Sequence, residues 1–351
     1  MLNELLDSYF RLDRLTLIML MLVLLIGICV IGYSYRYMKG DNFNRIFFIR
    51  IGLLMFALMI MISSNNLILL FIAWYSAHAL IVRLMIHKPS WQAAKAAGLL
   101  IRKYYLASAA CIATAFGLFY LSARQLNIQY LIHSHNNSIL VLPALMLLVV
   151  GVMISSTIWP FHGWLASSLN SPTPVSAIMH AGLVNGGGFL LARFAPLYFL
   201  HPRLLTTLFL WGLFSAMLGT IWKLMQTDIK RMLAYSTMGQ MGYMLAQCGL
   251  GLFSAAIAHL VLHSMFKAYL FLNSANAVKQ KNYNPVYSFQ LSSLLVALCC
   301  GALGSVSFAY ANGNMVLAYN TTLVLIIIAF VSSTQLVLTI LSTVTLKRVI
   351  S

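Results

Sequence analysis

The chain has 351 residues, of which 61% are hydrophobic and only 8% are charged, and its mean hydropathy is +0.89. A soluble domain carries about 25% charged residues, so this chain lacks the polar surface that a water-soluble fold needs. The formal net charge of +17 does not indicate a nucleic-acid partner, because the basic residues are spread thinly between apolar segments. We expect the chain to be surrounded by a lipid bilayer instead.

Apolar runs of about 17 to 25 residues recur along the chain, and a helix needs this length to cross a bilayer. We therefore predict an all-α polytopic membrane protein with a single integral membrane domain over residues 1–351. No cleavable signal is expected, because the first apolar run is long and follows a charged leader, Glu4 to Arg14. About eleven spans are expected, at about 15–35, 46–62, 66–86, 104–122, 139–158, 173–199, 204–224, 232–249, 252–278, 289–310 and 321–346.

Lysine and arginine residues divide unevenly between the two sides of these spans. Sixteen lie in odd-numbered connections or at the C-terminus, five lie on the opposite side, and Lys267 lies within a span. Cytoplasmic loops carry the excess of basic residues, so this pattern predicts an outside N-terminus and a cytoplasmic C-terminus in a bacterial inner membrane. All five cysteines lie in apolar runs without metal-ligand spacing, so no metal or redox cofactor is expected in this chain.

The connection after the fifth span, "SSTIWPFHGWLASSLNSPTPVSAIMH" (155–180), is rich in proline. Proline breaks a helix interior but suits a first turn, so the fifth span should break near Pro160, continue as a short amphipathic piece, and give way to a new helix around Thr173. Broken helices at membrane depth need protein or a water-filled cavity around them, and in transporters they mark the ion path. His162 could line this break, although an interfacial loop position is the favoured interpretation. The candidate residues of this region are Ser155, Pro160, His162, Pro172 and Pro174.

Ionisable groups interrupt the ninth apolar run, "HLVLHSMFKAYLF" (259–271). His259, His263 and Lys267 fall at i, i+4 and i+8, so a helix places all three on one face. A lysine at the bilayer centre costs at least about 2.5 kcal/mol on insertion scales, and histidine titrates near neutral pH, which favours a hydrated proton relay. The alternative for each histidine is a neutral imidazole bonded to a nearby carbonyl. A zinc site is disfavoured, because this HxxxH lacks the glutamate of HExxH and a nearby third ligand.

Three motifs in the same order resemble the antiporter-like membrane subunits of respiratory complex I and of multi-subunit Na⁺/H⁺ antiporters. They are "SPTPVSAIMHAGLVNGGGFLLARF", "QTDIKRMLAYSTMGQMGYM" and "HLVLHSMFKAYLFL", and the resemblance covers roughly residues 30 to 275. Within this superfamily, "NSPTPVSAIMHAGLVNGGGFLLARFAPL" looks most like the DabB family of inorganic-carbon pump subunits. The resemblance implies a leading helix (about 15–35) and two inverted five-helix repeats (about 46–199 and 204–346), with broken helices at the fifth and tenth spans.

The resemblance also assigns roles to particular residues. His180 matches the family's histidine after the Pro-Thr-Pro turn, and the three groups of the ninth run match positions of its central polar axis. Lys223 lies at a cytoplasmic helix end, where a relay role and contact with lipid headgroups are alternatives. Two charged positions of the family carry other residues here: Tyr75 replaces the family's glutamate, and Ser155 replaces its lysine. These replacements argue against a complex I-type pump.

The favoured function is that of a membrane subunit in an energy-coupled CO₂ or bicarbonate uptake complex. The resemblance implies a DabA-like partner at the membrane surface, similar to a zinc carbonic anhydrase, so zinc is expected in the partner and no catalytic residue is expected in this transporter subunit. The chain itself would conduct protons or another cation. Two alternatives are a passive membrane anchor for the partner, and a translocating subunit of an NADH:quinone oxidoreductase or Na⁺/H⁺ antiporter.

Overall fold

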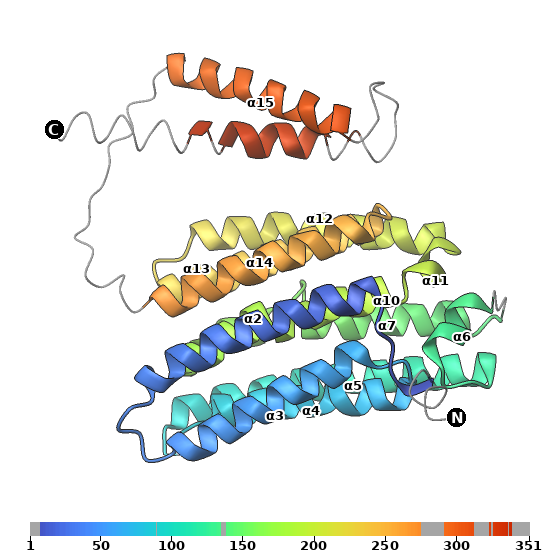
Figure 1. Ribbon diagram of the computed structural model, residues 1–351, viewed down its shortest axis with the longest axis vertical. Helices are drawn as coiled ribbons and strands as arrows, with labels where there is room; N and C mark the ends of the chain where they lie inside the picture. The colour runs from blue at the N-terminus through green and yellow to red at the C-terminus, as the bar shows by residue number, and fades with distance from the viewer. Residues whose placement is uncertain are drawn as a thin grey trace. The chain divides into compact units, whose positions relative to one another are not determined.

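The computed structural model describes residues 8–88, 90–134, 138–274, 291–311, 323, 326–335 and 337–338. The chain divides into two compact units, Met1–Ala277 and Val278–Ser351. Every regular element within these ranges is a helix, apart from two isolated β-bridges. Seven helices of the described part are long and apolar enough to cross a membrane, which agrees with an all-α, multi-pass membrane protein (Figure 1). The count of eleven spans and the inverted repeats remain predictions.

The first unit begins with four long helices that correspond to the first four expected spans. Asp13 caps the first of them by accepting a hydrogen bond from the Thr16 backbone nitrogen, which an N-terminal turn otherwise leaves unpaired. The fourth is longer than its apolar run at 104–122, because a polar first part that includes Lys95 and Arg102 continues the helix. The four helices are α2 (Arg14–Tyr37), α3 (Asn44–Ser63), α4 (Leu67–Met85) and α5 (Gln92–Ala123).

The fifth and sixth expected spans are divided into short pieces. α7 ends at Ser155, five residues before Pro160, and α9 begins at Thr173, where the prolines predicted a new helix. The sixth span is interrupted as well, although 173–199 was expected to be continuous. A 3₁₀ turn follows Gly182, and a further short helix begins at Ala195 with Pro196 in its first turn. The fifth span contains α7 (Val141–Ser155), and the sixth contains α9 (Thr173–Ala181), η2 (Leu183–Asn185), α10 (Gly186–Arg193) and α11 (Ala195–Phe199). The connections before and after the fifth span contain α6 (Ile128–His133), α8 (Gly163–Ser167) and η1 (Ser168–Asn170).

Side chains satisfy the backbone groups that the break after α7 would otherwise expose. The Trp159 backbone nitrogen donates to the Ser215 hydroxyl at 3.1 Å, and the Trp211 indole nitrogen donates to the Trp159 carbonyl at 2.7 Å. The Ser156 hydroxyl donates to the Val184 carbonyl at 2.8 Å, which joins the two interrupted spans. A non-helical segment at membrane depth is stable only with such internal partners.

Three further helices complete the first unit: α12 (Pro202–Leu224), α13 (Ile229–Gly249) and α14 (Phe253–Asn273). They form one layer, and α3, α4 and α5 form another at the opposite side of the unit, with α2, α7, α9 and α10 between them (Figure 1). α9 contacts α14, α2 and α4, so the interrupted sixth span lies at the centre of the unit. Accordingly, 89% of the most apolar stretch within Thr173–Arg193 is buried inside the protein.

Glycines bring the backbones of α12 and α13 into direct contact. A Cβ atom on Gly219 would lie 2.4 Å from the Gly239 nitrogen, and one on Gly242 would lie 2.6 Å from the Ala216 nitrogen. Real Cβ atoms do not approach so closely, so any larger residue must push the helices apart. Small residues at such positions are the usual means of close helix packing in membranes.

A buried arginine joins α10 to the start of α2. Arg193 donates from Nη1 to the Asp13 carboxylate at 2.9 Å, and from Nη2 to the Thr16 hydroxyl and the Ile62 carbonyl, each at 2.8 Å. Its guanidinium also lies 5.1 Å from the centre of the Phe189 ring. The charge pattern counted Arg193 only as one of the five basic residues on the predicted outer side, so this structural role was missed.

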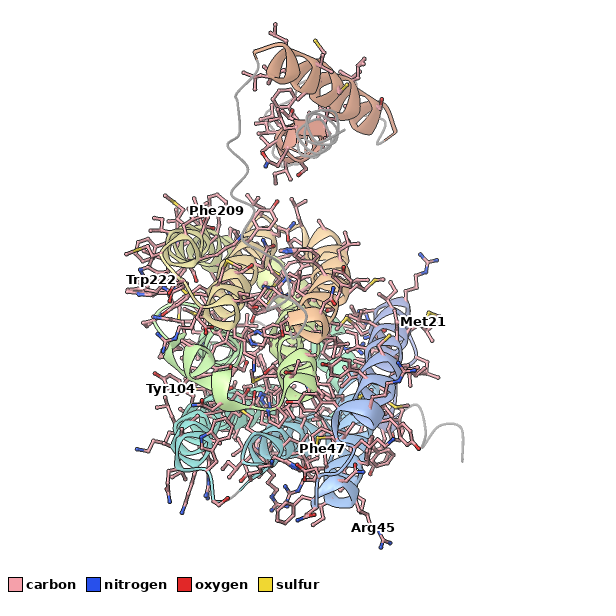
Figure 2. All side chains as sticks on the ribbon, turned by 90° about the vertical axis from the view of Figure 1, so that its left-hand side faces the viewer. Met21, Arg45, Phe47, Tyr104, Phe209 and Trp222 are labelled. Atoms are coloured by element: carbon pink, nitrogen blue, oxygen red, sulfur yellow. The ribbon has the colours of Figure 1, made fainter. Side chains whose placement is uncertain are left out.

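Apolar side chains are abundant on the outside of the unit as well as within it. Figure 2 shows Met21 directed away from the helices, where it is 69% exposed, and Phe47 directed into them, where it is fully buried. A soluble protein does not present long helices with apolar residues all around them, whereas a lipid-surrounded helix does. The exposed apolar faces therefore belong in hydrocarbon.

The second unit contains α15 (Leu291–Ala311) and further helical residues at 326–335. The resemblance implied a broken tenth span, but α15 continues without interruption through Gly301 and Gly304. These glycines provide close packing instead: a Cβ on Gly301 would overlap Thr334, and one on Gly304 would lie 3.0 Å from the Ser333 hydroxyl. Half of the eleventh expected span, 321–346, lies outside the described residues.

Candidate functional site

The polar face of α14 is buried within the first unit. Lys267 is fully buried, His263 is 5% exposed, and His259 is partly exposed nearer the start of the helix. The rings of His259 and His263 lie 6.1 Å apart, edge to face. At 1.5 Å per residue the three groups extend over about 12 Å along the helix. We call His259, His263 and Lys267, together with His180 beside them, the polar file.

Lys267 reaches the Leu233 carbonyl of α13 directly, and His180 reaches it through the Thr237 hydroxyl. The Thr237 hydroxyl and Lys267 Nζ both donate to the Leu233 carbonyl, at 3.0 and 2.9 Å. Since the single hydroxyl hydrogen of Thr237 is used there, its oxygen accepts from His180 Nδ1 at 3.0 Å, and this pattern assigns the Nδ1–H tautomer to His180. A carbonyl cannot pass a proton on, so Leu233 positions the two bases rather than linking them chemically.

Two glutamines of α13 hold the imidazole of His259. Its Nδ1 lies 3.0 Å from the Gln247 amide oxygen, and its Nε2 lies 2.7 Å from the Gln240 amide oxygen. An imidazolium donates to both oxygens, whereas a neutral imidazole needs one amide turned so that its nitrogen donates to the ring. Because an amide reverses its polarity by rotation, this pair suits both protonation states of His259.

His263 lies between the other groups and keeps one ring nitrogen unpaired. His263 Nε2 is buried without a hydrogen-bond partner among the described residues, and His180 lies within electrostatic range of both His263 and Lys267. Beside this group, the Asn185 amide nitrogen donates to the Ser264 hydroxyl, which ties the interrupted sixth span to α14. An unpaired buried nitrogen at this position can receive or release a proton without first breaking another bond.

The remaining candidate residues lie at the end of α12 and along the connection from α7 to α9. Lys223, in the last turn of α12, is partly buried and within electrostatic range of Lys267. The His162 ring lies 4.7 Å from the Trp222 ring, and the Ser155 hydroxyl donates to the Val152 carbonyl of its own helix. Pro172 and Pro174 flank the first residue of α9.

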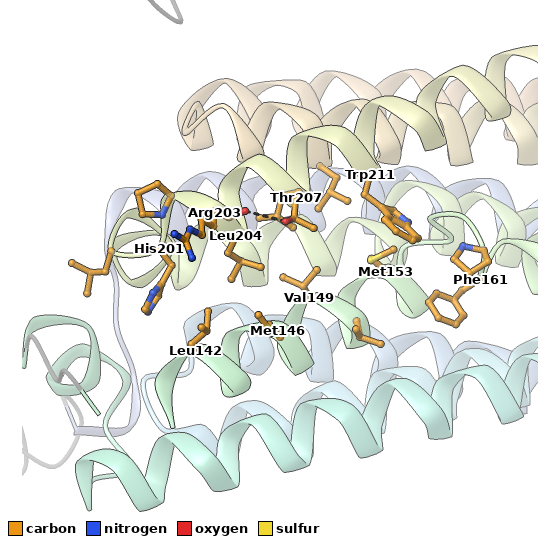
Figure 3. A pocket seen from close by; sticks show the side chains of 16 residues that line it. Leu142, Met146, Val149, Met153, Phe161, His201, Arg203, Leu204, Thr207 and Trp211 are labelled. Atoms are coloured by element: carbon orange, nitrogen blue, oxygen red, sulfur yellow. Dashed lines mark hydrogen bonds between the residues drawn. The ribbon is translucent and has the colours of Figure 1, made fainter. Parts of the chain in front are cut away.

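Pro160 lies on an apolar cavity of about 890 Å³ between α7 and α12 (Figure 3). Met153 and Trp211 are among the apolar side chains that line it, and Arg203 lies at one end. Within the described part of the chain, no hydrogen bond joins Pro160 or His162 to the polar file. The structure therefore brings together the four residues of the polar file, with Lys223 near one end, and places the proline break on a separate apolar surface.

Carboxylates are absent from the described surroundings of the polar file. Asp13, Asp41 and Asp228, the acids within the described ranges, lie at helix ends or in a loop. That Tyr75 and Ser155 stand where the resembled family carries its charged pair stays a prediction. Among the described residues, no three His, Cys, Asp or Glu side chains are grouped in a way that could hold a metal ion.

The sequence did carry a signal for the residues that were missed on α13. Thr237, Gln240 and Gln247 fall at i, i+3 and i+10 within an otherwise apolar run, so they lie on one helical face. That face meets the polar file on α14. The Leu233 carbonyl carried no such signal, because a backbone acceptor has no mark in the sequence.

This fold, with an interrupted central span and a buried polar file, defines a multi-pass helical membrane protein of the antiporter-like type. A family model described as "NADH:quinone oxidoreductase/Mrp antiporter, TM" matches residues 64–347. A second, described as "NADH-Ubiquinone oxidoreductase (complex I), chain 5 N-terminus", matches residues 6–48. The chain belongs to this family of NADH:quinone oxidoreductase and Mrp antiporter membrane subunits.

Curated relatives include inorganic-carbon transporter subunits. The chain is 35% identical over 292 residues to the probable inorganic carbon transporter subunit DabB1 of Halothiobacillus neapolitanus, covering 79% of this chain and 52% of that protein. It is 37% identical to the probable DabB of Bacillus subtilis, covering 77% and 54%, and 32% identical to NADH-quinone oxidoreductase subunit L of Campylobacter jejuni, covering 78% and 46%. The chain thus spans about half the length of these relatives.

A solved structure supports the fold. A chain of the Mrp complex from Dietzia sp. DQ12-45-1b superposes with a TM-score of 0.71 and 23% sequence identity. The superposition covers 94% of this chain and 39% of that chain. The match confirms the antiporter-like fold that the sequence motifs predicted.

Proposed function

We propose that this chain is the membrane subunit of an energy-coupled uptake complex for CO₂ or bicarbonate. It conducts protons or another cation along the polar file and so drives a partner at the membrane surface. The partner is a DabA-like, zinc-binding protein that resembles a carbonic anhydrase, and the zinc belongs to that partner. The likeness to DabB subunits supports the substrate class, and the polar file supports the ion path.

The observation that carries this proposal is a set of four neighbouring ionisable side chains, three buried and His259 partly exposed, without a described carboxylate near them. Burying such groups is costly in a membrane interior, and intramembrane ionisable residues are retained chiefly for ion or proton transfer. Lys267 is fully buried and His180 is 1% exposed, so neither serves the surface. Their hydrogen-bond partners on α13 hold them in place for proton transfer along the polar file.

The test is gradient-driven uptake of labelled inorganic carbon by membranes that contain the native complex. Lys267→Met keeps the length and packing of the side chain and removes its exchangeable proton, so uptake should fall at least about tenfold. Lys95→Met, at an exposed position of α5, is the matched control and should leave uptake unchanged. Partner co-purification should survive in both variants, since loss of a buried charge relieves an insertion cost.

A passive membrane anchor is the second candidate, and the replacement of the family's charged pair by Tyr75 and Ser155 favours it. Wild-type uptake in an intact complex with Lys267→Met would establish this role and rule out the relay. Co-purification with iron–sulfur subunits instead would indicate an NADH:quinone oxidoreductase, and antiport without any partner of the carbonic-anhydrase type would indicate a Na⁺/H⁺ antiporter.

The proposed setting is a bacterial inner membrane, with the N-terminus outside and the C-terminus in the cytoplasm. The division of basic residues, sixteen against five, supports this orientation. A C-terminal reporter that is active only on the outer side of the membrane would contradict it.

A further inference from the structure

A polar crevice lies between α4 and α5, away from the polar file. Its volume is about 290 Å³, which equals the share of roughly ten water molecules in the liquid. Its polar lining consists of Tyr75, His78, Arg83, Arg102 and Tyr105. The relay proposed above uses none of these residues.

Two buried polar atoms in this crevice lack partners. His78 is 3% exposed and donates from Nδ1 to the Trp74 carbonyl at 2.7 Å, so its neutral ring presents a bare lone pair at Nε2. Neither this Nε2 nor the Tyr105 hydroxyl has a hydrogen-bond partner among the described residues. The two rings pack edge to face at 4.3 Å, so both atoms belong to one small region. Buried polar atoms are nearly always paired, which indicates a ligand that completes both.

Two cations face the same crevice from opposite helices. Arg83 of α4 and Arg102 of α5 are exposed, and neither forms an ion pair within the described ranges. No carboxylate is among the lining residues. A guanidinium presents a planar fork of donors that matches an oxyanion, so the crevice offers donors for negatively charged oxygens and one acceptor at its base.

We propose that this crevice binds a small oxyanion that also carries a hydroxyl hydrogen. The anionic oxygens accept from the two guanidinium groups and from the Tyr105 hydroxyl, and the ligand's hydroxyl donates to His78 Nε2. Hydrogen carbonate and hydrogen phosphate have this chemistry in free form, and the headgroup of phosphatidylglycerol has it in a lipid. The assignment stands independently of the proposed ion path, because it concerns other helices and is tested by binding alone.

The test uses the full chain in nanodiscs made of zwitterionic lipid, with ¹³C-labelled hydrogen carbonate as the probe and NMR saturation transfer as the readout. Binding should saturate and should be displaced by inorganic phosphate but not by chloride. Arg102→Gln and Tyr105→Phe should each weaken it at least about tenfold, the usual effect of removing a hydrogen bond to a charged group. Lys103→Gln removes the same charge one residue away, outside the crevice, and should leave affinity unchanged.

Mass spectrometry of protein extracted from native membranes distinguishes the lipid source. The crevice is assigned to the lipid headgroup if phosphatidylglycerol co-purifies with the wild type and with Lys103→Gln but not with Arg102→Gln. In that case hydrogen carbonate should bind only after the lipid has been removed. Equal binding of both ligands in Arg102→Gln, Tyr105→Phe and Lys103→Gln overturns the proposal. Tyr105→Phe decides the matter if Arg102→Gln misfolds, because it removes one oxygen and keeps the ring packing against His78 and Trp164.

Discussion

The buried ion pair between Asp13 and Arg193 should respond very differently to the loss of each member. Asp13→Ala leaves a guanidinium whose side chain is 1% exposed without its counter-charge, and breaking a buried pair in this way costs about 3–5 kcal/mol. The same substitution removes the cap of α2, which contributes about 1 kcal/mol more. We expect Asp13→Ala to lower the free energy of unfolding by about 4–6 kcal/mol.

Arg193→Met should be milder, because it removes the buried charge itself. Asp13 would remain 26% exposed, would still cap α2, and would keep its pair with Arg11 at 2.9 Å. The hydrogen bonds that Arg193 gives to Thr16 and Ile62 would be lost, at a cost of about 1–3 kcal/mol. The double variant should therefore be more stable than the sum of the single effects predicts.

The assay is reversible unfolding of the purified chain in mixed detergent micelles, with both single variants and the double variant as a thermodynamic cycle. The expected coupling energy is about 3 kcal/mol, at the upper end for residues in contact. The reasoning fails if Arg193→Met is the more damaging substitution, or if the two effects simply add. Either result would show that this ion pair is solvated and not buried.

Two further predictions concern packing and pH. Gly242→Val should lower the free energy of unfolding by about 1–3 kcal/mol or more in the same assay, because its Cβ would lie 2.6 Å from the Ala216 nitrogen. Gly117→Val is the control, since a Cβ there would have no neighbour within 4 Å. An equal loss of stability in both variants would refute the close contact. The hydrogen bond from the Phe43 backbone nitrogen holds the pKa of Asp41 below its ordinary value of 3.8. The ionised Asp41 carboxylate therefore stabilises the fold above about pH 3.8, and this stabilisation is lost as the pH falls through the lowered pKa. The melting temperature of the wild type minus that of Asp41→Asn should therefore shrink on acidification below about pH 4, and a constant difference would contradict this.

Local chemistry made part of the fold predictable. Hydropathy located the long helices, and the fixed φ of proline located the start of α9 at Thr173. The helical period placed His259, His263 and Lys267 on one face, and the structure has them there. These inferences need only residues that are near each other in sequence.

The remainder depended on partners far apart in the chain. Asp13 and Arg193 are 180 residues apart, and nothing in either segment indicates the other. The partners of the polar file lie on α13, and one of them is a backbone carbonyl that every residue possesses. The resemblance implied a break in the tenth span, but whether a glycine in such a span ends the helix or admits a neighbour depends on the neighbour, here the segment around Thr334.

The glycine contact between α12 and α13 has a mechanical consequence. Because the two backbones touch at several levels, a displacement of α13 toward α12 presses directly on the α12 backbone. α13 carries the acceptors, including the Leu233 carbonyl and the two glutamines, whereas α14 carries the bases. A shift of α13 as a whole therefore carries α12 with it, so helix movement that changes the distance between these acceptors and the bases of α14 takes place between the α12–α13 pair and α14.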